Sequence, residues 1–295
     1  MTDLSAEELG FDRARLDRIG EVVSRDIEQE MYDGAVLCVS RGGVTAMLEA
    51  FGYADRASGT AMEADRLFIS LSMAKQLTGV VALNRVERGD LSLTMKVAEV
   101  IPEFGCRGKE HITLYQLLTH TAGLQLGPPP VSPEKMGNLE AVVAGICDSP
   151  VETVPGTSVH YSALCAHAII AEMVRRVEGQ NVSFREIMQR DLFEPLGMQE
   201  TSLGRRADLA SRVCPVVARY ASEGLFDPAG IIGLDMLVTE TAEIPAGGYV
   251  TSAGDMNIFA NMLLNGGEWN GVRILSPAMI NLIMTNQTGE KVNNI

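Results

Sequence analysis

The sequence lacks the side-chain patterns that build metal and nucleotide sites. Its five cysteines are scattered, odd in number and free of any C-x-x-C spacing, which argues against a disulfide framework or a structural zinc site. The four histidines include no His-Glu-x-x-His pair, and no glycine-rich phosphate loop follows a strand pattern. We therefore expect neither a metal nor another cofactor.

Positive charge is also scarce. The chain has 24 Lys and Arg against 38 Asp and Glu, a formal net charge of −14. This balance argues against a nucleic-acid partner, because phosphate binding needs clustered Lys and Arg. Residues 1–19 lack the apolar core that a signal peptide or a membrane span requires. These features predict a reduced, cytoplasmic protein without a membrane partner, although they leave a removed presequence open.

What is present is ordinary globular composition, with 46% apolar and 21% charged residues. A length of 295 residues allows one large domain or two moderate ones. Two strand-like runs, 34–40 and 44–51, flank a glycine turn and predict a β-hairpin. An amphipathic helix is predicted before them over 6–30. Its apolar stripe consists of Leu16, Ile19, Val23 and Ile27.

The pattern after the hairpin is mainly helical. Apolar residues recur at three- and four-residue steps from Ser72 to Gly89, and this glycine is placed to end the helix. Residues 221–246 lack clear periodicity and are predicted to form a long loop. Ser252 is predicted to cap a helix, with Asp255 as its capping-box partner. Further helices are expected over 113–118, 163–178, 184–192 and from Ser276 onward.

The pair Ser72 and Lys75 is the first candidate for catalysis. Residues three positions apart share one helix face, so the lysine amine lies beside the serine hydroxyl and can make it a nucleophile. The same spacing occurs at Ser132 and Lys135, but that pair follows an exposed proline-rich loop. There Ser132 is expected only to cap a short helix with Pro133 at its first position. Context therefore favours Ser72.

Ser72 has an ordinary interpretation as well. A serine at the start of a helix commonly caps the free amides of the first turn. The catalytic interpretation gains because Lys75 falls on a helix that is otherwise apolar, and a buried lysine is costly without a role. Near a helix N-terminus, the dipole and the free backbone amides would also stabilise negative charge on a bound carbonyl oxygen.

Tyr161 is the candidate for the third group, which passes a proton to the leaving group. Its alternative role is to pack its ring against the domain. His160 adjoins it and is a candidate for the pocket, whereas His120 and His167 are expected to be structural because no metal-ligand spacing surrounds them. A Gly-x-Ser-x-Gly elbow is absent, which disfavours an α/β-hydrolase.

Five motifs in order resemble the serine β-lactamase/penicillin-binding superfamily, in particular its class C β-lactamase-like branch with the family VIII carboxylesterases and transesterases. They are Ser-x-x-Lys at Ser72, Leu-Leu-Thr-His-Thr-x-Gly-Leu from Leu117, Pro-Gly-x-x-x-x-Tyr-Ser from Pro155, Pro-Leu-Gly-Met from Pro195, and Gly247-Gly248 followed by Ser252 and Asp255. Each motif alone is weak, but their order is specific. The resemblance runs from about residue 6 to residue 290.

The resemblance implies a fold and a set of roles. An α/β domain with an antiparallel sheet flanked by helices, residues 1–65 and about 250–295, would pack on a mainly helical domain of about 66–249. The site would lie in the cleft between them. Ser72 would be the acylated nucleophile, Lys75 its proton-managing partner, and Tyr161 the general base and then acid. The Ser72 amide would form half of the oxyanion hole.

Two departures from the family pattern shape the prediction. The tyrosine motif commonly continues as Tyr-x-Asn, but here that position is Ala163, which weakens a β-lactam reading and favours esters. The third family motif, which supplies the second oxyanion amide from a strand, is not found; Gln287-Thr288-Gly289 follows a helix too closely and is taken as chance. The sheet is therefore expected to be incomplete, either because the sequence is a fragment or because the protein is short.

These observations predict a serine hydrolase that cleaves small carboxylic esters, or transfers their acyl group, through an acyl-enzyme. The first alternative is a β-lactamase or D,D-peptidase. The second, from a different class, is a non-catalytic binding protein with a degenerate or truncated site.

Overall fold

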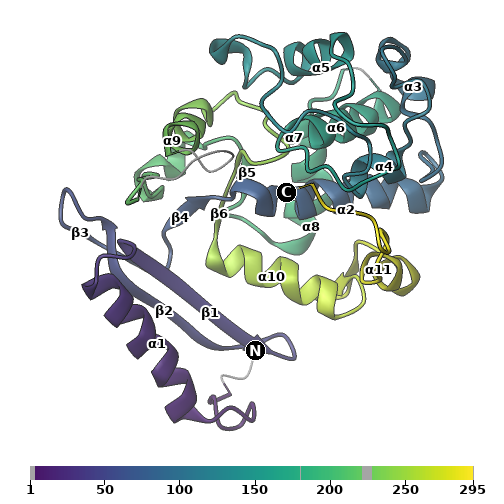
Figure 1. The fold of residues 1–295 in the computed structure, drawn as a ribbon. Coiled ribbons are helices and arrows are strands. Elements are labelled where there is room, and N and C mark those ends of the chain that lie inside the picture. Colours follow the sequence, from purple (N-terminus) through teal and green to yellow (C-terminus); the bar gives the residue numbers. More distant parts are fainter. Residues whose placement is uncertain (1–3, 180, 221–227, 295) are drawn as a thin grey trace.

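The computed structural model describes residues 4–179, 181–220 and 228–294. At its N-terminal end a hairpin of β1 (Gly34–Arg41) and β2 (Val44–Asp55) pairs antiparallel, as predicted, and β3 (Thr60–Ala61) continues the sheet. Helix α1 (Arg13–Glu28) crosses one face of this hairpin (Figure 1), where its Leu16 packs with Met47. In the described residues β1 pairs with β2 alone.

Helix α1 is shorter than predicted. It begins at Arg13 rather than near residue 6, because the side chain of Asp12 caps it by accepting the Arg15 N–H. The stripe is also narrower than predicted: Leu16 and Ile27 are buried, whereas Ile19 is 41% exposed. The face that packs on the hairpin includes Gly20 instead.

A small antiparallel sheet at the centre of the molecule joins distant parts of the chain. Strand β6 (Tyr249–Ser252) pairs with β4 (Leu67–Ile69) on one side and with β5 (Ser202–Leu203) on the other. Strand β6 crosses the expected domain boundary near residue 250, while its partners β4 and β5 both lie inside the range 66–249 that was expected to be mainly helical (Figure 1). The boundaries themselves stay a prediction.

Helices α2 (Ala74–Arg88) and α6 (Cys165–Glu178) form the centre of the largest apolar core. Gly89 ends α2 in the left-handed region at φ +82°, as its position predicted. The predicted helices at 113–118, 163–178 and 184–192 are confirmed within a few residues. The remaining elements of this region are η1 (Leu71–Met73), α3 (Val97–Val100), η2 (Pro102–Phe104), α4 (Leu114–Leu118), η3 (Pro133–Lys135), α5 (Leu139–Asp148), α7 (Phe184–Met188), η4 (Gln189–Phe193), α8 (Glu194–Leu196) and η5 (Ala207–Arg212).

The predicted loop at 221–246 is partly wrong. Residues 228–237 form a helix, α9 (Pro228–Leu237), while 221–227 lie outside the described residues. The sequence of α9 is PAGIIGLDML, apolar almost throughout. It lacks the polar face that gives an amphipathic helix its 3.6-residue period, so periodicity could not reveal it.

Helix α10 (Ala253–Leu264) follows β6 directly and connects the hairpin to the helical part. Its cap Ser252 accepts the Asp255 N–H as predicted, but the Asp255 carboxylate binds Thr201 and the Glu200 N–H instead of completing a capping box. On the other side of α10, the hydroxyl of Ser40 in β1 donates to Asn257 Oδ1.

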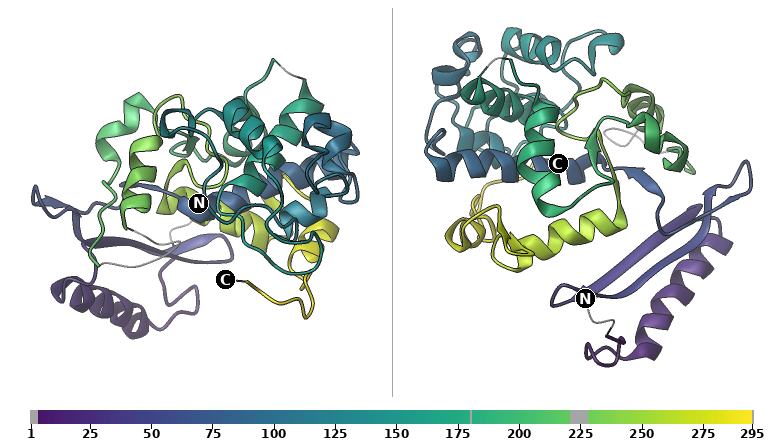
Figure 2. Two further views of the ribbon diagram at one scale, coloured as in Figure 1. Left: turned by 45° about the horizontal axis from the view of Figure 1, so that its top comes forward. Right: turned by 180° about the vertical axis from the view of Figure 1, so that it is seen from behind.

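After α10 come β7 (Glu268–Trp269), β8 (Val272–Arg273) and α11 (Pro277–Ile283), the last capped by Ser276 as predicted. The final described residues run back beside residues 152–162, the loop that carries Tyr161 and is called the tyrosine loop below. The Val159 N–H donates to the Val292 carbonyl, and the Asn294 N–H donates to the Val159 carbonyl. Seen from behind (Figure 2), α1 and the hairpin stand to one side of the helices, linked to them through β4 and α10. Within the described ranges, no helix is both long and apolar enough to cross a bilayer.

Candidate active site

Ser72 lies in the short turn η1, between β4 and α2. The preceding Leu71 adopts φ +44°, an uncommon left-handed conformation for a branched side chain. The N-cap of α2 is Met73, so the hydroxyl of Ser72 caps nothing. The side chain is exposed, whereas Lys75, three residues on, is buried with 9% exposure. The turn therefore presents the hydroxyl to solvent above an amine held inside the protein.

The structure brings the three predicted catalytic side chains together. Ser72 Oγ lies 2.6 Å from the hydroxyl of Tyr161, and Lys75 Nζ donates to the same Oγ over 3.1 Å. Lys75 Nζ also donates to the carbonyl of Ala246 over 3.0 Å, and it lies 5.1 Å from the centre of the Tyr161 ring. A neutral Lys75 amine can therefore take the proton of Oγ, either directly or by relay through the Tyr161 hydroxyl, to which Lys75 is also hydrogen-bonded. This geometry is that of an activated nucleophile.

The environment of Lys75 makes the neutral amine easier to reach than in an exposed lysine. Burial lowers the pKa of Lys75 below its usual value, and hydrogen bonding to Tyr161 opposes this effect in part. A lower pKa leaves a larger fraction of the amine free of its proton at neutral pH. The amine is thereby better suited to take the proton of Ser72 than an exposed lysine would be.

The Ser72 N–H is available for an oxyanion. It donates to no acceptor within the described part of the chain, and it lies at the N-terminal end of α2, where the helix dipole favours negative charge. A second donor is not assigned. Thr288 and Gly289, which look superficially like the third motif, both donate backbone N–H groups to the Asn286 side chain in a turn after α11, not on a strand.

The tyrosine loop is held by the segment that carries the Leu-Leu-Thr-His-Thr-x-Gly-Leu motif. The Gly156 N–H donates to Thr121, the His160 N–H donates to His120 over 2.7 Å, and the Glu152 N–H donates to Gly123. Gly123 adopts φ +70°, and a Cβ there would overlap the carbonyl oxygen of Thr153. Only glycine fits both conditions at this close approach of two backbones.

Two histidines behave differently from their sequence-based interpretation. His160 points to Glu152, with Nε2 and Oε2 2.8 Å apart, and none of its hydrogen bonds reaches Ser72, Lys75 or Tyr161; its place in the pocket stays a prediction. His120, expected to be only structural, packs its ring 4.8 Å from that of Tyr161 and accepts the Ser162 N–H at Nδ1. Burial, helped by the charge of Lys75, lowers the pKa of His120 to about 4. In the sequence, the sign that pointed to His120 was its position in the Leu-Leu-Thr-His-Thr-x-Gly-Leu motif.

The second serine–lysine pair, Ser132 and Lys135, lies at the exposed turn η3, with Pro133 at its first position as predicted. Ser132 stands at the N-cap position, but its side chain makes no capping hydrogen bond. Neither side chain contacts Ser72, Lys75 or Tyr161 in the described structure. Among the described residues there is also no group of three or more His, Cys, Asp or Glu side chains arranged to hold a metal ion.

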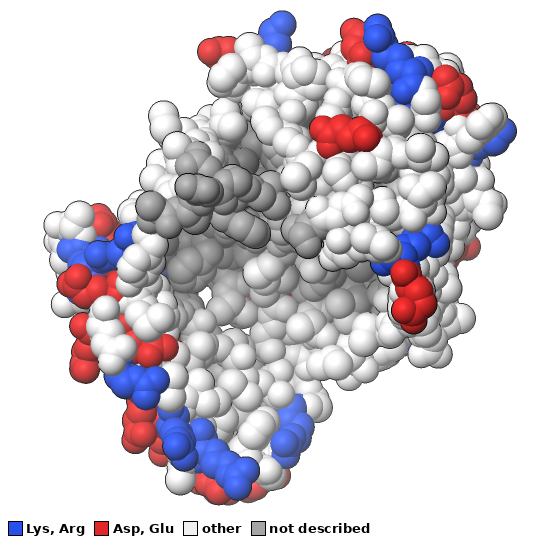
Figure 3. All heavy atoms as spheres, in the orientation of Figure 1, with Lys and Arg blue, Asp and Glu red and all other residues white. Residues whose placement is uncertain are grey.

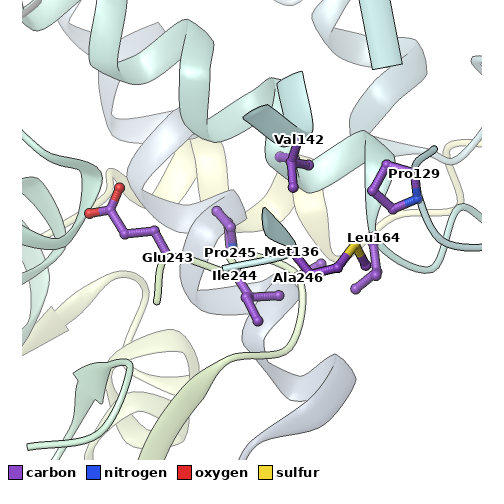
Figure 4. A pocket seen from close by; sticks show the side chains of 9 residues that line it. Pro129, Met136, Val142, Leu164, Glu243, Ile244, Pro245 and Ala246 are labelled. Carbon is purple, nitrogen blue, oxygen red and sulfur yellow. The ribbon is translucent and has the colours of Figure 1, made fainter. Parts of the chain in front are cut away.

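A small apolar cavity adjoins the site. Met136, Leu164 and Ala246 point toward one another in it (Figure 4), and Ala246 is the residue whose carbonyl binds Lys75. About 10 Å³ is open to the centre of a water molecule, room for roughly one water. On the face seen in Figure 3, charged side chains gather over α1 with the hairpin and over the outer helices, while the hollow between them is largely uncharged.

Comparison with known proteins identifies the family. The family model described as Beta-lactamase matches residues 21–292, nearly the whole chain. The chain belongs to the β-lactamase family. A solved structure described as a family VIII carboxylesterase superimposes with a TM-score of 0.77 at 23% identity, covering 90% of this chain and 73% of that one. The β-lactamase/transpeptidase-like fold expected from the motifs is thereby confirmed.

Relatives within the β-lactamase family carry different names. Esterase EstB from Burkholderia gladioli is 30% identical over 200 residues, which are 62% of this chain and 50% of EstB. Penicillin-binding protein 4 from Amycolatopsis lactamdurans is 30% identical over 261 residues, 87% of this chain and 66% of that protein. The chain thus spans about half to two thirds of their length. At the level of class, it is a serine hydrolase of the β-lactamase family.

Proposed function

We propose that this β-lactamase family member hydrolyses small carboxylic esters, or transfers their acyl group to an alcohol, through an acyl-enzyme on Ser72. The observation that carries the proposal is the position of Ser72 Oγ, 2.6 Å from the Tyr161 hydroxyl and 3.1 Å from Lys75 Nζ. A serine with a proton acceptor on each side is the arrangement that nucleophilic catalysis requires.

In the first half of the reaction, Ser72 Oγ attacks the ester carbonyl carbon while its proton passes to the neutral amine of Lys75, either directly or through the Tyr161 hydroxyl, which gives its own proton to Lys75. A new C–O bond forms, and the carbonyl electron pair moves to the oxygen, which the Ser72 N–H and the end of α2 stabilise. Collapse breaks the bond to the alcohol, which leaves with the proton. Water, or a second alcohol, then repeats these steps on the acyl-enzyme and releases the acid or a new ester.

Two observations favour an ester over a β-lactam. By the family pattern, Ala163 stands where an amide side chain would bind the amide of a β-lactam or peptide, and an ester has no such N–H. EstB, at 30% identity, is named an esterase. Penicillin-binding protein 4 has the same sequence identity to this chain, 30%, and its name points the other way. The β-lactamase or D,D-peptidase alternative is therefore tested alongside the ester.

The deciding experiment measures p-nitrophenyl butyrate and a chromogenic cephalosporin in parallel, with the wild type and Ser72→Ala. Ester turnover that Ser72→Ala abolishes, with little cephalosporin turnover, supports the proposal. The opposite preference would identify a β-lactamase. Background rates on both substrates, with no covalent labelling of Ser72, would support the alternative of a non-catalytic binding protein.

The cytoplasmic location expected from residues 1–19 remains a proposal, which cell fractionation tests.

A further inference from the structure

His120 contacts the tyrosine loop at three points and touches none of the reacting atoms. We propose that His120 is the positioning residue for proton transfer: it fixes the Tyr161 hydroxyl beside Ser72 Oγ by binding the backbone on both sides of the tyrosine while its ring packs on the phenol. The inference rests on the proposed acylation of Ser72. It adds a residue other than Ser72, Lys75 and Tyr161 to the proposed mechanism.

The first support is a pair of hydrogen bonds that bracket Tyr161. The carbonyl of His120 accepts the His160 N–H over 2.7 Å, and its Nδ1 accepts the Ser162 N–H over 3.2 Å. One residue thus binds the positions directly before and directly after the tyrosine. Such a bracket restricts the φ and ψ angles of Tyr161, and with them the direction of its side chain.

The ring contact fixes what the backbone bonds leave free. The His120 and Tyr161 ring centres lie 4.8 Å apart at 42°, and the His120 ring also lies 5.5 Å from His167. The phenol therefore rests against a ring that has a second ring contact of its own. Rotation of Tyr161 about χ1 would break this contact and carry its hydroxyl away from Ser72. Rotation about χ2 would disturb the ring contact alone, because the hydroxyl oxygen lies on the χ2 axis.

The backbone of His120 is strained in a way that serves this geometry. Its φ is +53°, in the left-handed region that non-glycine residues rarely adopt. This conformation is what lets the carbonyl and the ring of one residue both face the tyrosine loop. Strained residues that persist in a folded chain cluster at functional sites.

The role needs an uncharged ring. Nδ1 accepts a hydrogen bond from a backbone amide, so its proton sits on Nε2. A protonated ring would lose this acceptor and would place a second positive charge near Lys75. Burial and the nearby Lys75 lower the pKa of His120 to about 4, so the ring is neutral at neutral pH. The hydrogen-bonding pattern and the surroundings of the ring therefore agree.

The test compares His120→Asn with His120→Leu. Asparagine tolerates the left-handed backbone, and its Oδ1 can accept the Ser162 N–H in place of the histidine Nδ1. Leucine has a side chain of similar size, but it neither tolerates the left-handed backbone nor accepts a hydrogen bond. The readout is the second-order rate at which a fluorophosphonate labels Ser72. In that step Oγ bonds to phosphorus, fluoride leaves, and the serine proton passes to Tyr161 or Lys75, so it reports the activated serine without needing an ester substrate.

We expect His120→Leu to be labelled about 100-fold more slowly, as for a misplacement of about 1 Å in a catalytic group, and His120→Asn within about tenfold of wild type. His111→Leu, at an exposed histidine, controls for the substitution and is expected to be unchanged. With p-nitrophenyl butyrate, kcat is expected to fall in His120→Leu while KM stays within about threefold, the pattern of an interaction made only in the transition state.

Equal rates for His120→Leu and wild type, or equally slow rates for the Leu and Asn variants at similar thermal stability, would overturn the inference. If His120→Leu fails to fold, His120→Gln replaces it, since it keeps a polar side chain but moves the acceptor one bond outward. Normal labelling of the wild type without ester turnover would count against the proposed function alone. A wild type that is not labelled at all would overturn both.

Discussion

The hydroxyl oxygens of Ser72 and Tyr161 lie 2.6 Å apart, although 89 positions separate the two residues in the chain. Two independent pieces of local structure produce this distance. Strand β4 and the turn η1 deliver the serine at the start of α2, and the segment around His120 holds the loop that delivers the tyrosine. A change in either piece is therefore expected to affect the reaction even where it leaves both catalytic side chains intact.

Replacing the nucleophile has a matched control within the chain. Ser72→Ala is expected to lower kcat/KM for p-nitrophenyl butyrate by more than about 10³-fold, because it removes the hydroxyl that is hydrogen-bonded to both Lys75 and Tyr161. Ser132→Ala changes a serine with the same spacing to a lysine in an exposed turn and is expected to leave the rate unchanged. A loss of similar size in both variants would show that the nucleophile has been misassigned.

Removing the Tyr161 hydroxyl is expected to affect proton transfer more than binding. Tyr161→Phe should lower kcat by about 10²- to 10⁴-fold, the range for a general acid–base group, with little change in KM. The control is Tyr249→Phe. That hydroxyl is buried against Thr78, so its loss is expected to cost about 1–3 kcal/mol in the free energy of unfolding and to leave kcat near wild type. Steady-state kinetics with thermal unfolding of both variants separates the two effects.

The lowered pKa of Lys75 predicts that the free energy of unfolding depends on pH. Its pKa is lowered from 10.5 in the folded state, chiefly by burial. Between the lowered pKa and 10.5, unfolding takes up a proton, so the contribution of Lys75 to stability rises with pH through that window. Lys75→Met has no such proton. We therefore expect the free energy of unfolding of Lys75→Met, measured relative to wild type, to decrease as the pH is raised through the window.

Urea unfolding at a series of pH values measures this difference. The control variant is Lys135→Met, at an exposed lysine of the second serine–lysine pair. A pH trend in Lys135→Met as large as that in Lys75→Met would contradict the assignment to the buried amine.

Two glycines test the support of the tyrosine loop. Gly123 and Gly89 both adopt positive φ, but an added Cβ would overlap the Thr153 carbonyl only at Gly123 and would meet nothing within 4 Å at Gly89. Both alanine variants are expected to lose roughly 1–2 kcal/mol from the left-handed backbone. Gly123→Ala should in addition lower kcat, because residues 152–162 must move away. Equal kcat values at temperatures where both variants are folded would show that the loop does not need this close approach.

The three candidate catalytic side chains could be picked out from the sequence because their signals are local. Ser72 and Lys75 are three positions apart at the start of a helix pattern, and Tyr161 follows a proline–glycine turn at a fixed place in the order of motifs. His120 was present in a motif, but the role proposed for it depends on a left-handed backbone and on a bond to Ser162, 42 positions away in the chain, which no local pattern reports. Asp255 likewise looked like a capping-box residue, because its actual partner, Thr201, is distant in sequence.

The errors in the fold have similar causes. Asp12 is the N-cap of α1, and its residue type is one that commonly caps helices. The prediction used only the spacing of apolar residues, so the helix was predicted to start too early. Helix α9 has no polar face and therefore no period to detect. The hairpin, by contrast, was predicted correctly, since its two strand patterns and the turn between them are adjacent in the chain.

Leu71 opens a question of protein engineering. Its left-handed backbone, at φ +44° directly before the nucleophile, costs conformational energy of the order of 1 kcal/mol. Leu71→Gly would relieve this strain, but it would also remove the packing of Leu71 against the cluster of Leu67, Ile69 and Val250 and would add conformational freedom to the unfolded chain. The same change would free the turn that aims Ser72 at Tyr161 and Lys75. Screens that raise the melting temperature of this chain are accordingly expected to keep leucine at position 71.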